Sequence, residues 1–444
     1  MTFADFILLH ENDDPVHLLL ARDRYPDIDL DLAVTTLEVR KKLKAKVPEW
    51  YAVPSLVYPF RLSGEQCSSS ETAKYKARVI SGSSVVPEPS LRDPSHKWAP
   101  PSYAAEGGHR FGDHTAPGND VLRIADLTGG MGVDAWAFAS VAQEVLYNEM
   151  SGELARATEL NFRELGVGNV RFRNERVEPG KVREVLDGFR PDVIFLDPAR
   201  RAEDGRKVFL IEECQPDVLG LLPELFEASR HVLLKLSPMA DITMACKRLE
   251  HVKEVHVVAS GGECKELLFL LDREWEGEHS LFIVEGGAAM VIPGQAGNDG
   301  DRHGRPDRPS RMPIAGDVLF EPGKALAKAG AFDLPCAQFG LTKLGLHTHL
   351  YVGGTVPEGL RPFGKTFGIL EVVPLSNRTL KEVGRRYPQA EVTARNVPMT
   401  SDLLRKKLGC ASGGDVHLFG VRVDTASGGD NYLIITKRIV YGTD

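Results

Sequence analysis

The stretch Val121–Gly132, VLRIADLTGGMG, decides the fold expected for this chain. An apolar run predicts a strand, the acid Asp126 follows it, and a helical pattern, VDAWAFASVA, begins directly after Gly132. The turn between them contains Thr128, Gly129, Gly130 and Gly132. Glycine lets the backbone approach a ligand closely, and the N-terminus of the following helix faces that ligand. We therefore expect strand, turn and helix to form a nucleotide-binding corner.

Residues 121–272 alternate short apolar segments with helical patterns, which predicts a parallel sheet covered by helices on both faces. The expected strands are 121–126, 143–148, 169–173, 192–197, 230–236, 253–259 and 266–271. Ligands of such sheets bind at the carboxyl ends of the strands. The residues that carry the chemistry are therefore expected at those ends.

Polar residues follow the second and third expected strands. Glu149 lies beyond the glycine turn at the distance, about 20 residues, where an acid accepts hydrogen bonds from ribose hydroxyls. A helix-capping or surface glutamate is the alternative. Asn174 ends the third strand, where its side chain could meet an adenine edge.

The fourth strand ends in Asp197-Pro198-Ala199-Arg200. Pro198 has a fixed φ and favours an extended residue before it, so Asp197 and the next carbonyls are expected beside the cofactor. An ordinary strand-ending turn is the alternative. A basic cluster follows that could clamp phosphate: Arg200, Arg201, Arg206 and Lys207. Lys235, in the fifth strand, could meet a phosphate or Asp197, or be a snorkelling structural lysine.

Length and composition limit the class of protein. The 444 residues are too many for one core, and 26% charged and 42% hydrophobic residues are ordinary for a globular protein. The net charge of −8 argues against a uniformly basic surface but not against a local basic face. No apolar run is long enough to span a membrane, and the acidic N-terminus is unlike a signal peptide. The six scattered cysteines predict reduced thiols, a cytoplasmic location and no metal site.

The remaining segments predict further domains. Residues 1–80 have helical spacing, with a basic run Arg40–Lys46 that is either a solvated face or a phosphate-contacting one. A capped helix start is expected in EQCSSSETAKYKA. Residues 81–120 form a flexible linker or insert, and 273–360 an α+β domain with a disordered insert at 293–313. The last domain, 361–444, contains 13 Lys and Arg against 8 Asp and Glu, which hints at nucleic-acid binding.

The region 121–272 resembles a class I S-adenosylmethionine-dependent methyltransferase. DLTGGMG matches the family's D-x-x-x-G-x-G cofactor loop, Glu149 its ribose acid, and LDPAR its catalytic-strand motif. EQCSSSETAKYKA resembles the segment of trimethylguanosine synthase-type RNA methyltransferases that closes over the methionine end. The whole chain resembles an uncharacterised bacterial methyltransferase family with a helical N-terminus, a ferredoxin-like insert and a THUMP-like C-terminal domain.

This resemblance implies a Rossmann-like, seven-stranded α/β sheet, S-adenosyl-L-methionine as cofactor, and RNA as substrate, since THUMP modules bind structured RNA. It implies catalytic roles for Asp197, Pro198, Arg200 and Lys235. The cofactor-binding residues it implies are Ser70, Thr72, Asp126, Thr128, Gly129, Gly130, Gly132, Glu149 and Asn174. Neither a metal nor a membrane is implied.

The chain departs from the related motifs in two ways. Base amino-methyltransferases have [DNS]-P-P-[FYW] where this chain has Asp197-Pro198-Ala199-Arg200, so the aromatic that stacks on a flipped base is missing. C5-uracil methyltransferases have D-P-P-R but need a cysteine after the fifth strand, where this chain has Ser237-Pro238-Met239. Covalent C5 chemistry would need Cys214, Cys246 or Cys264 to reach the site.

Three other functions therefore stay open: a small-molecule or protein methyltransferase, a non-catalytic cofactor- or RNA-binding module, and a nicotinamide dehydrogenase. The last is the weakest, because the loop lacks the full G-x-G-x-x-G pattern and has Ala135 three residues after Gly132.

Overall fold

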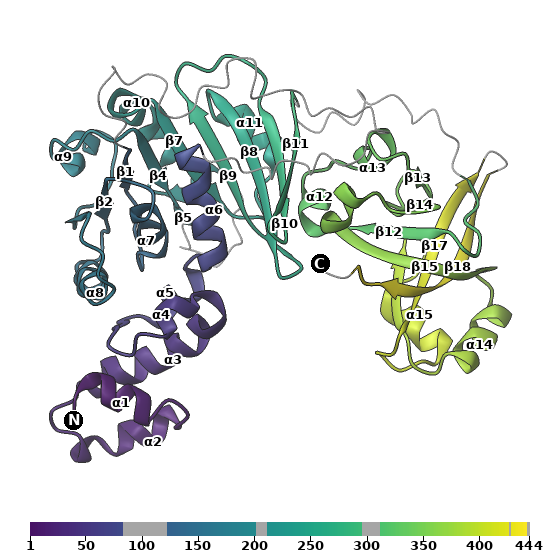
Figure 1. The fold of residues 1–444 in the computed structure, drawn as a ribbon, viewed down its shortest axis with the longest axis horizontal. Coiled ribbons are helices and arrows are strands. Elements are labelled where there is room, and N and C mark those ends of the chain that lie inside the picture. Colours follow the sequence, from purple (N-terminus) through teal and green to yellow (C-terminus); the bar gives the residue numbers. More distant parts are fainter. Residues whose placement is uncertain (83–121, 201–210, 295–310, 426–427, 442–444) are drawn as a thin grey trace. The chain divides into compact units, whose positions relative to one another are not determined.

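The computed structural model describes residues 1–82, 122–200, 211–294, 311–425 and 428–441. The chain divides into two compact units (Figure 1). The first contains Met1–Val255 and Leu267–Ser280, and the second His256–Glu266 and Leu281–Asp444. Most of the expected inserts, 81–120 and 293–313, lies outside the described residues, as do Arg201, Arg206 and Lys207.

The N-terminal part of the first unit is helical. Its helices are α1 (Phe3–Leu9), α2 (Pro15–Leu20), η1 (Arg22–Arg24), α3 (Leu30–Lys46), α4 (Pro48–Tyr51), α5 (Arg61–Gln66) and α6 (Ser70–Ser81). The expected capped start is present, because the Ser69 side chain accepts a hydrogen bond from the backbone of Thr72. Helix α6 ends at Gly82, which has the left-handed conformation common after helices.

Part of the basic run in α3 (Leu30–Lys46) serves the fold of the N-terminal helices, and its exposed lysines, Lys41 and Lys44, lie on a solvated face. Arg40 is buried, donates to the carbonyls of Tyr51 and Val53, and lies over the Tyr51 ring. Lys46 donates to the Cys67 carbonyl at 2.9 Å. Lys42 pairs with Glu65. The long side chains thus satisfy carbonyls and carboxylates of neighbouring loops, a use that helical spacing does not reveal.

A nine-stranded sheet has the order β11-β10-β8-β9-β7-β4-β1-β2-β3. Its strands are β1 (Arg123–Asp126), β2 (Glu144–Asn148), β3 (Val170–Arg173), β4 (Val193–Leu196), β7 (His231–Leu236), β8 (Val252–Ser260), β9 (Glu263–Asp272), β10 (Ser280–Glu285) and β11 (Ala288–Ile292). All seven strands expected in 121–272 are present. The expectation of a fully parallel sheet is wrong at β9, which pairs with β7 antiparallel, whereas β3, β2, β1, β4 and β7 are parallel.

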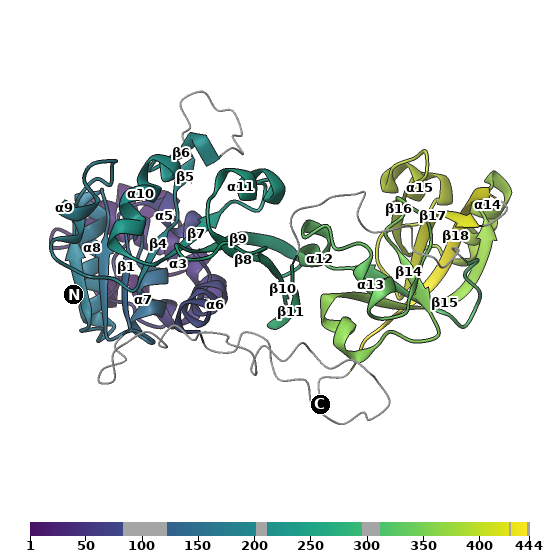
Figure 2. The same cartoon turned by 90° about the horizontal axis from the view of Figure 1, so that it is seen from above.

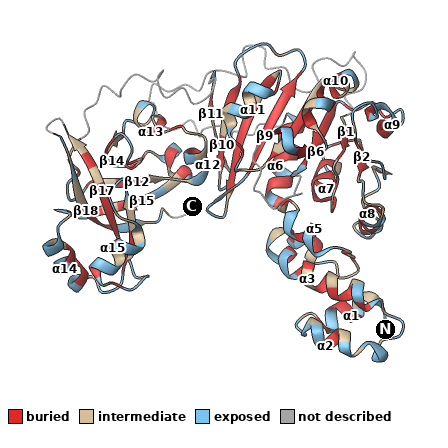
Figure 3. Cartoon of the chain, turned by 180° about the vertical axis from the view of Figure 1, so that it is seen from behind, coloured by how far each residue is buried: buried red, intermediate tan, exposed pale blue. Residues whose placement is uncertain are grey.

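Helices cover this sheet on two sides. They are α7 (Val133–Ala139), α8 (Gly152–Glu164), α9 (Val182–Leu186), α10 (Val218–Ala228) and α11 (Ile242–Arg248). Figure 2 shows α10 and α11 on one face and α6 and α7 on the other. Strand β4 is fully buried, as are most of β7 and the last seven residues of β9, and Figure 3 shows β9 mostly buried. After β4 the chain forms a two-stranded ribbon of β5 (Ala199–Arg200) and β6 (Cys214–Gln215), next to η2 (Ile211–Glu213).

The second unit contains a seven-stranded sheet of order β13-β14-β12-β15-β18-β17-β16. Its strands are β12 (Val318–Pro322), β13 (Thr342–Lys343), β14 (Tyr351–Gly353), β15 (Gly364–Pro374), β16 (Glu391–Arg395), β17 (Val416–Thr425) and β18 (Gly428–Ile439). Its helices are α12 (Lys324–Lys328), α13 (Leu334–Ala337), η3 (Glu358–Phe363), α14 (Asn377–Arg386) and α15 (Ser401–Leu408).

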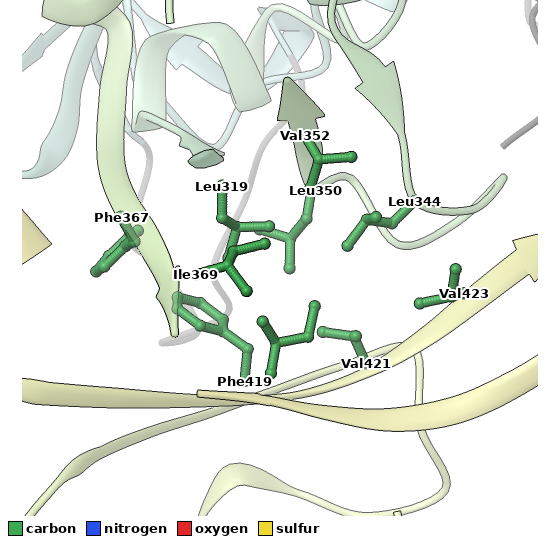
Figure 4. Close-up of a cluster of buried hydrophobic side chains, with 10 residues drawn as sticks. Leu319, Leu344, Leu350, Val352, Phe367, Ile369, Phe419, Val421 and Val423 are labelled. Carbon is green, nitrogen blue, oxygen red and sulfur yellow. The ribbon is translucent and has the colours of Figure 1, made fainter. Parts of the chain in front are cut away.

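Alternation along β17 and β18 gives this sheet a core on each face. Phe419 and Val421 pack on one face with Leu319 and Phe367 (Figure 4), and Ile434 belongs to the same core. On the other face Leu418, Leu433 and Ile435 contact the apolar sides of α14 and α15. These two helices approach closely at Gly384, where a Cβ would collide with the Leu408 carbonyl. Within the described residues, every helix is too short or too polar to span a bilayer.

Candidate functional site

The loop from β1 to α7 depends on its three glycines for different reasons. A Cβ at Gly129 would lie 2.1 Å from the Tyr147 ring, so only glycine fits. Gly132 has φ +88°, and a Cβ there would lie 2.6 Å from Thr158 and 2.8 Å from Phe162. Gly130 also has positive φ, +54°, but a Cβ there would meet only the Thr128 carbonyl, at 3.9 Å. The loop thus packs tightly against β2 and α8 and is open at Gly130.

The Glu149 carboxylate lies against this loop. One oxygen accepts the Gly130 amide at 3.0 Å, and the other accepts the Ser151 amide at 2.8 Å. The Asn174 side chain donates to the Glu149 carbonyl at 2.6 Å. The structure therefore brings Gly130, Glu149 and Asn174 together, as expected. Each carboxylate oxygen has a second lone pair, so Glu149 can still accept bonds from hydroxyls.

Asn148 holds three strand ends together, and the sequence reading missed it. Its amide nitrogen donates to the carbonyls of Leu127, at 3.2 Å, and Glu175, at 3.0 Å. Its side-chain oxygen accepts the Glu175 amide at 3.0 Å. Asn148 is 1% exposed. The signal for its role is a polar residue expected to be buried at the end of an apolar strand.

Asp197 and Lys235 form an ion pair at the carboxyl ends of β4 and β7. Lys235 Nζ lies 2.5 Å from Asp197 Oδ2, and the Asp197 amide donates to the Thr128 hydroxyl at 2.6 Å. Of the roles left open for Lys235, the structure shows the contact with Asp197. Pro198 is buried, and the backbone of Arg200 pairs with that of Cys214 in the β5–β6 ribbon.

Asp126 is fully buried at the end of β1. One oxygen accepts the Thr128 amide at 3.1 Å, and Oδ2 has no hydrogen-bond partner within the described residues. Burial raises the pKa of Asp126 well above its usual range, and the nearby carboxylates of Asp134, Asp197 and Glu149 add to the effect. A carboxyl held neutral can donate as well as accept a hydrogen bond.

In the serine-rich segment before α6, Ser68 is the residue that contacts α7. Ser68 donates to Asp134 Oδ2 at 2.8 Å and accepts from Lys76 Nζ at 3.0 Å. Of the two expected cofactor residues, Ser70 donates to Glu49 at 2.8 Å, and Thr72 donates to the Ser69 carbonyl at 3.2 Å. The sequence reading missed Ser68, Lys76 and Asp134, because no local pattern pairs α6 with α7.

The cysteines offer no activated thiol to this site. Burial raises the pKa of Cys246 to about 12 and that of Cys264 to about 11, which keeps both protonated. Cys246 lies near His279, and Cys214 is buried in β6. Within the described part of the chain, no group of three or more His, Cys, Asp or Glu could hold a metal ion.

A solved structure matches the chain over nearly its whole length. It is a candidate methyltransferase from Porphyromonas gingivalis W83, with 28% identity, a TM-score of 0.77, and coverage of 99% of this chain and 98% of that one. This chain has the fold of a class I methyltransferase. Family models for a ferredoxin-like domain and a THUMP domain-like region match residues 319–359 and 364–438. The expected resemblance and fold class are thereby confirmed.

Other solved methyltransferases match only part of the chain. A candidate RNA methyltransferase from Pyrococcus horikoshii has 21% identity and a TM-score of 0.22, over 30% of this chain and 58% of that one. An rRNA methylase from Streptococcus thermophilus has 12% identity and a TM-score of 0.25, over 35% and 89%. No curated protein matches the chain at a significant level.

The packing of the loop predicts that alanine destabilises the protein more at Gly132 than at Gly166, although both glycines have positive φ. Gly132→Ala and Gly166→Ala both place alanine at positive φ, +88° and +69°, but a Cβ at Gly166 meets nothing within 4 Å. Both variants should lose about 1–2 kcal/mol of unfolding free energy. Gly132→Ala should lose about 1–3 kcal/mol more, because the methyl group overpacks Thr158 and Phe162. Urea unfolding measures this, and equal losses would contradict the described packing.

Proposed function

We propose that this protein is an S-adenosylmethionine-dependent methyltransferase that methylates a base of RNA. The observation that carries the proposal is a convergence at the carboxyl ends of four adjacent parallel strands. The open glycine loop follows β1, Glu149 follows β2, and the Asp197–Lys235 pair joins β4 to β7. Ligands of open α/β sheets bind at such an edge.

The residues present fit this cofactor. The open side of Gly130 leaves room for a ligand against the backbone, and Glu149 next to it can accept from ribose hydroxyls. Asp126 Oδ2 is a buried oxygen without a partner among the described residues, at the end of the same strand. When bound, the cofactor supplies an electrophilic methyl group on a sulfonium. We assign Asp126, Thr128, Gly129, Gly130, Gly132, Glu149 and Asn174 to holding it.

Asp197 orients the nucleophile in this proposal. Lys235 contacts Oδ2 of Asp197 at 2.5 Å, and the Asp197 backbone amide donates to the Thr128 hydroxyl. The other oxygen and the following carbonyls are left to accept hydrogen bonds from a base amine. Holding that amine in line with the methyl group is the main catalytic task. Lys235 positions the carboxylate, and Pro198 fixes the backbone that carries it.

The RNA part of the proposal rests on the second unit. Its THUMP-like region contains α14 and α15, which pack side by side. Four exposed cations on these helices have no ion-pair partner within the described residues: Lys381, Arg385, Lys406 and Lys407. Cations without partners are available to phosphates. An open hollow in the same unit is lined by His347, Asn396, Arg422 and Asp424, among others, and its polar groups add possible contacts for a nucleotide.

Asp197→Ala tests the enzymatic role. Transfer of labelled methyl groups to total cellular RNA should fall at least about hundredfold, because the group that orients the nucleophile is lost. Cofactor affinity should change little. Asp192→Ala is the matched control, since Asp192 precedes the same strand at its opposite end and bonds the Arg123 amide.

Unchanged turnover in Asp197→Ala would refute the assigned role. Labelling of protein or of small molecules, with none in RNA, would show that the substrate class is wrong while the cofactor assignment holds.

Charge reversal on α15 tests the RNA surface. Lys406→Glu with Lys407→Glu should weaken RNA binding about tenfold or more and reduce the salt dependence by about two phosphate contacts. Arg190→Glu with Lys247→Glu makes the same change of charge at exposed sites of the first unit. Filter binding across a salt series measures both variants. Equal weakening by the two pairs would show a nonspecific charge effect and contradict the proposed surface.

A further inference from the structure

Lys76 is a fully buried cation that the proposed reaction does not use. It lies on α6, which packs against α7, and its side chain is 0% exposed. Its ammonium lies 3.1 Å from Asp134 Oδ1 and donates to the Ser68 hydroxyl at 3.0 Å. Ser68 in turn donates to the other Asp134 oxygen at 2.8 Å. Lys76, Ser68 and Asp134 thus form a closed buried ring.

The ring lies directly behind the glycine loop. Asp134 is in the first turn of α7, two residues after Gly132, the N-cap of that helix. Burial is the main cause of the raised pKa of Asp126, and the negative charge of Asp134 is the next largest cause. The loop is therefore surrounded by four carboxyl groups: Asp126, Asp134, Glu149 and Asp197. Lys76 neutralises the one that belongs to α7, as Lys235 does for Asp197.

A buried ion pair is a weak source of stability. Replacing both charges with apolar groups of similar size is often neutral, whereas removing one partner leaves an unpaired buried charge at high cost. Lys76 is on a helix that precedes the sheet, and Asp134 is on the helix that begins at the loop. Through this pair, a residue of the helical N-terminal part determines whether the carboxylate next to the loop is neutralised.

We infer that Lys76 is a positioning residue of the methyl-donor site. By neutralising Asp134 it lowers the negative charge next to the glycine loop. The inference rests on the proposed cofactor site. Asp134 raises the pKa of two neighbouring groups, Asp126 at the end of β1 and the thiol of Cys67 before α6. The carboxylates of Glu149 and Asp197 also raise the pKa of Asp126, whereas Lys46 and Lys235 lower that of Cys67.

The test compares Lys76→Met, the double variant Lys76→Met with Asp134→Asn, and the control Lys74→Met. Lys74 is an exposed lysine of the same helix that pairs with Glu49 at 2.6 Å. The readouts are calorimetric affinity for S-adenosylmethionine and thermal unfolding, both measured at neutral pH.

Lys76→Met should weaken donor binding at least about tenfold at neutral pH, since Asp134 is left buried and unpaired. The double variant, in which neither charge remains, should restore the affinity to within about threefold of the wild type and should recover the thermal stability. Lys74→Met should resemble the wild type.

Two results would overturn the inference. Wild-type affinity in Lys76→Met would show that the pair does not act on the site. A loss that the double variant fails to restore would show that Lys76 acts only through packing. Failure of the proposed function is distinguishable, because the wild type would then bind no donor although its unfolding could still reveal the ion pair.

Discussion

The close packing of the β1–α7 loop against Tyr147, Thr158 and Phe162 is the constraint on which the site depends. No side chain fits at Gly129 or Gly132, so the loop lies directly on β2 and α8. This contact brings the Gly130 amide to the Glu149 carboxylate, and Asn148 holds the neighbouring strand ends in place. The open surface at Gly130 exists because the rest of the loop is so tightly held.

Charge pairing extends from this loop in two directions. On one side Thr128 fixes the Asp197 amide and Lys235 holds its carboxylate, which ties the loop to β4 and β7. On the other side Lys76 and Ser68 hold Asp134, which ties it to α6. Each lysine is largely buried and lies against a carboxylate of a different element, Asp197 after β4 and Asp134 in α7.

Local patterns predicted the positions of the strands in 121–272 and the residues that lie at their ends. The alternation of apolar runs with helical spacing located every strand of 121–272, and strand ends located Glu149, Asp197 and Lys235. The antiparallel β9 was not predictable in this way, because periodicity does not give strand direction. Neither were Lys76, Ser68 and Asp134, which meet only through tertiary packing, nor the structural use of Arg40. The roles of Ser70, Thr72 and Arg200 in binding or catalysis stay predictions.

The central claim is that the glycine loop and Glu149 bind S-adenosylmethionine, and calorimetric titration of the full chain tests it most directly. We predict binding in the micromolar range for S-adenosylmethionine and none for NAD in a parallel titration. A variant Glu149→Gln should weaken the first, because a carboxylate accepts ribose hydroxyls better than an amide does. Binding of NAD instead, or of neither ligand, would contradict the account.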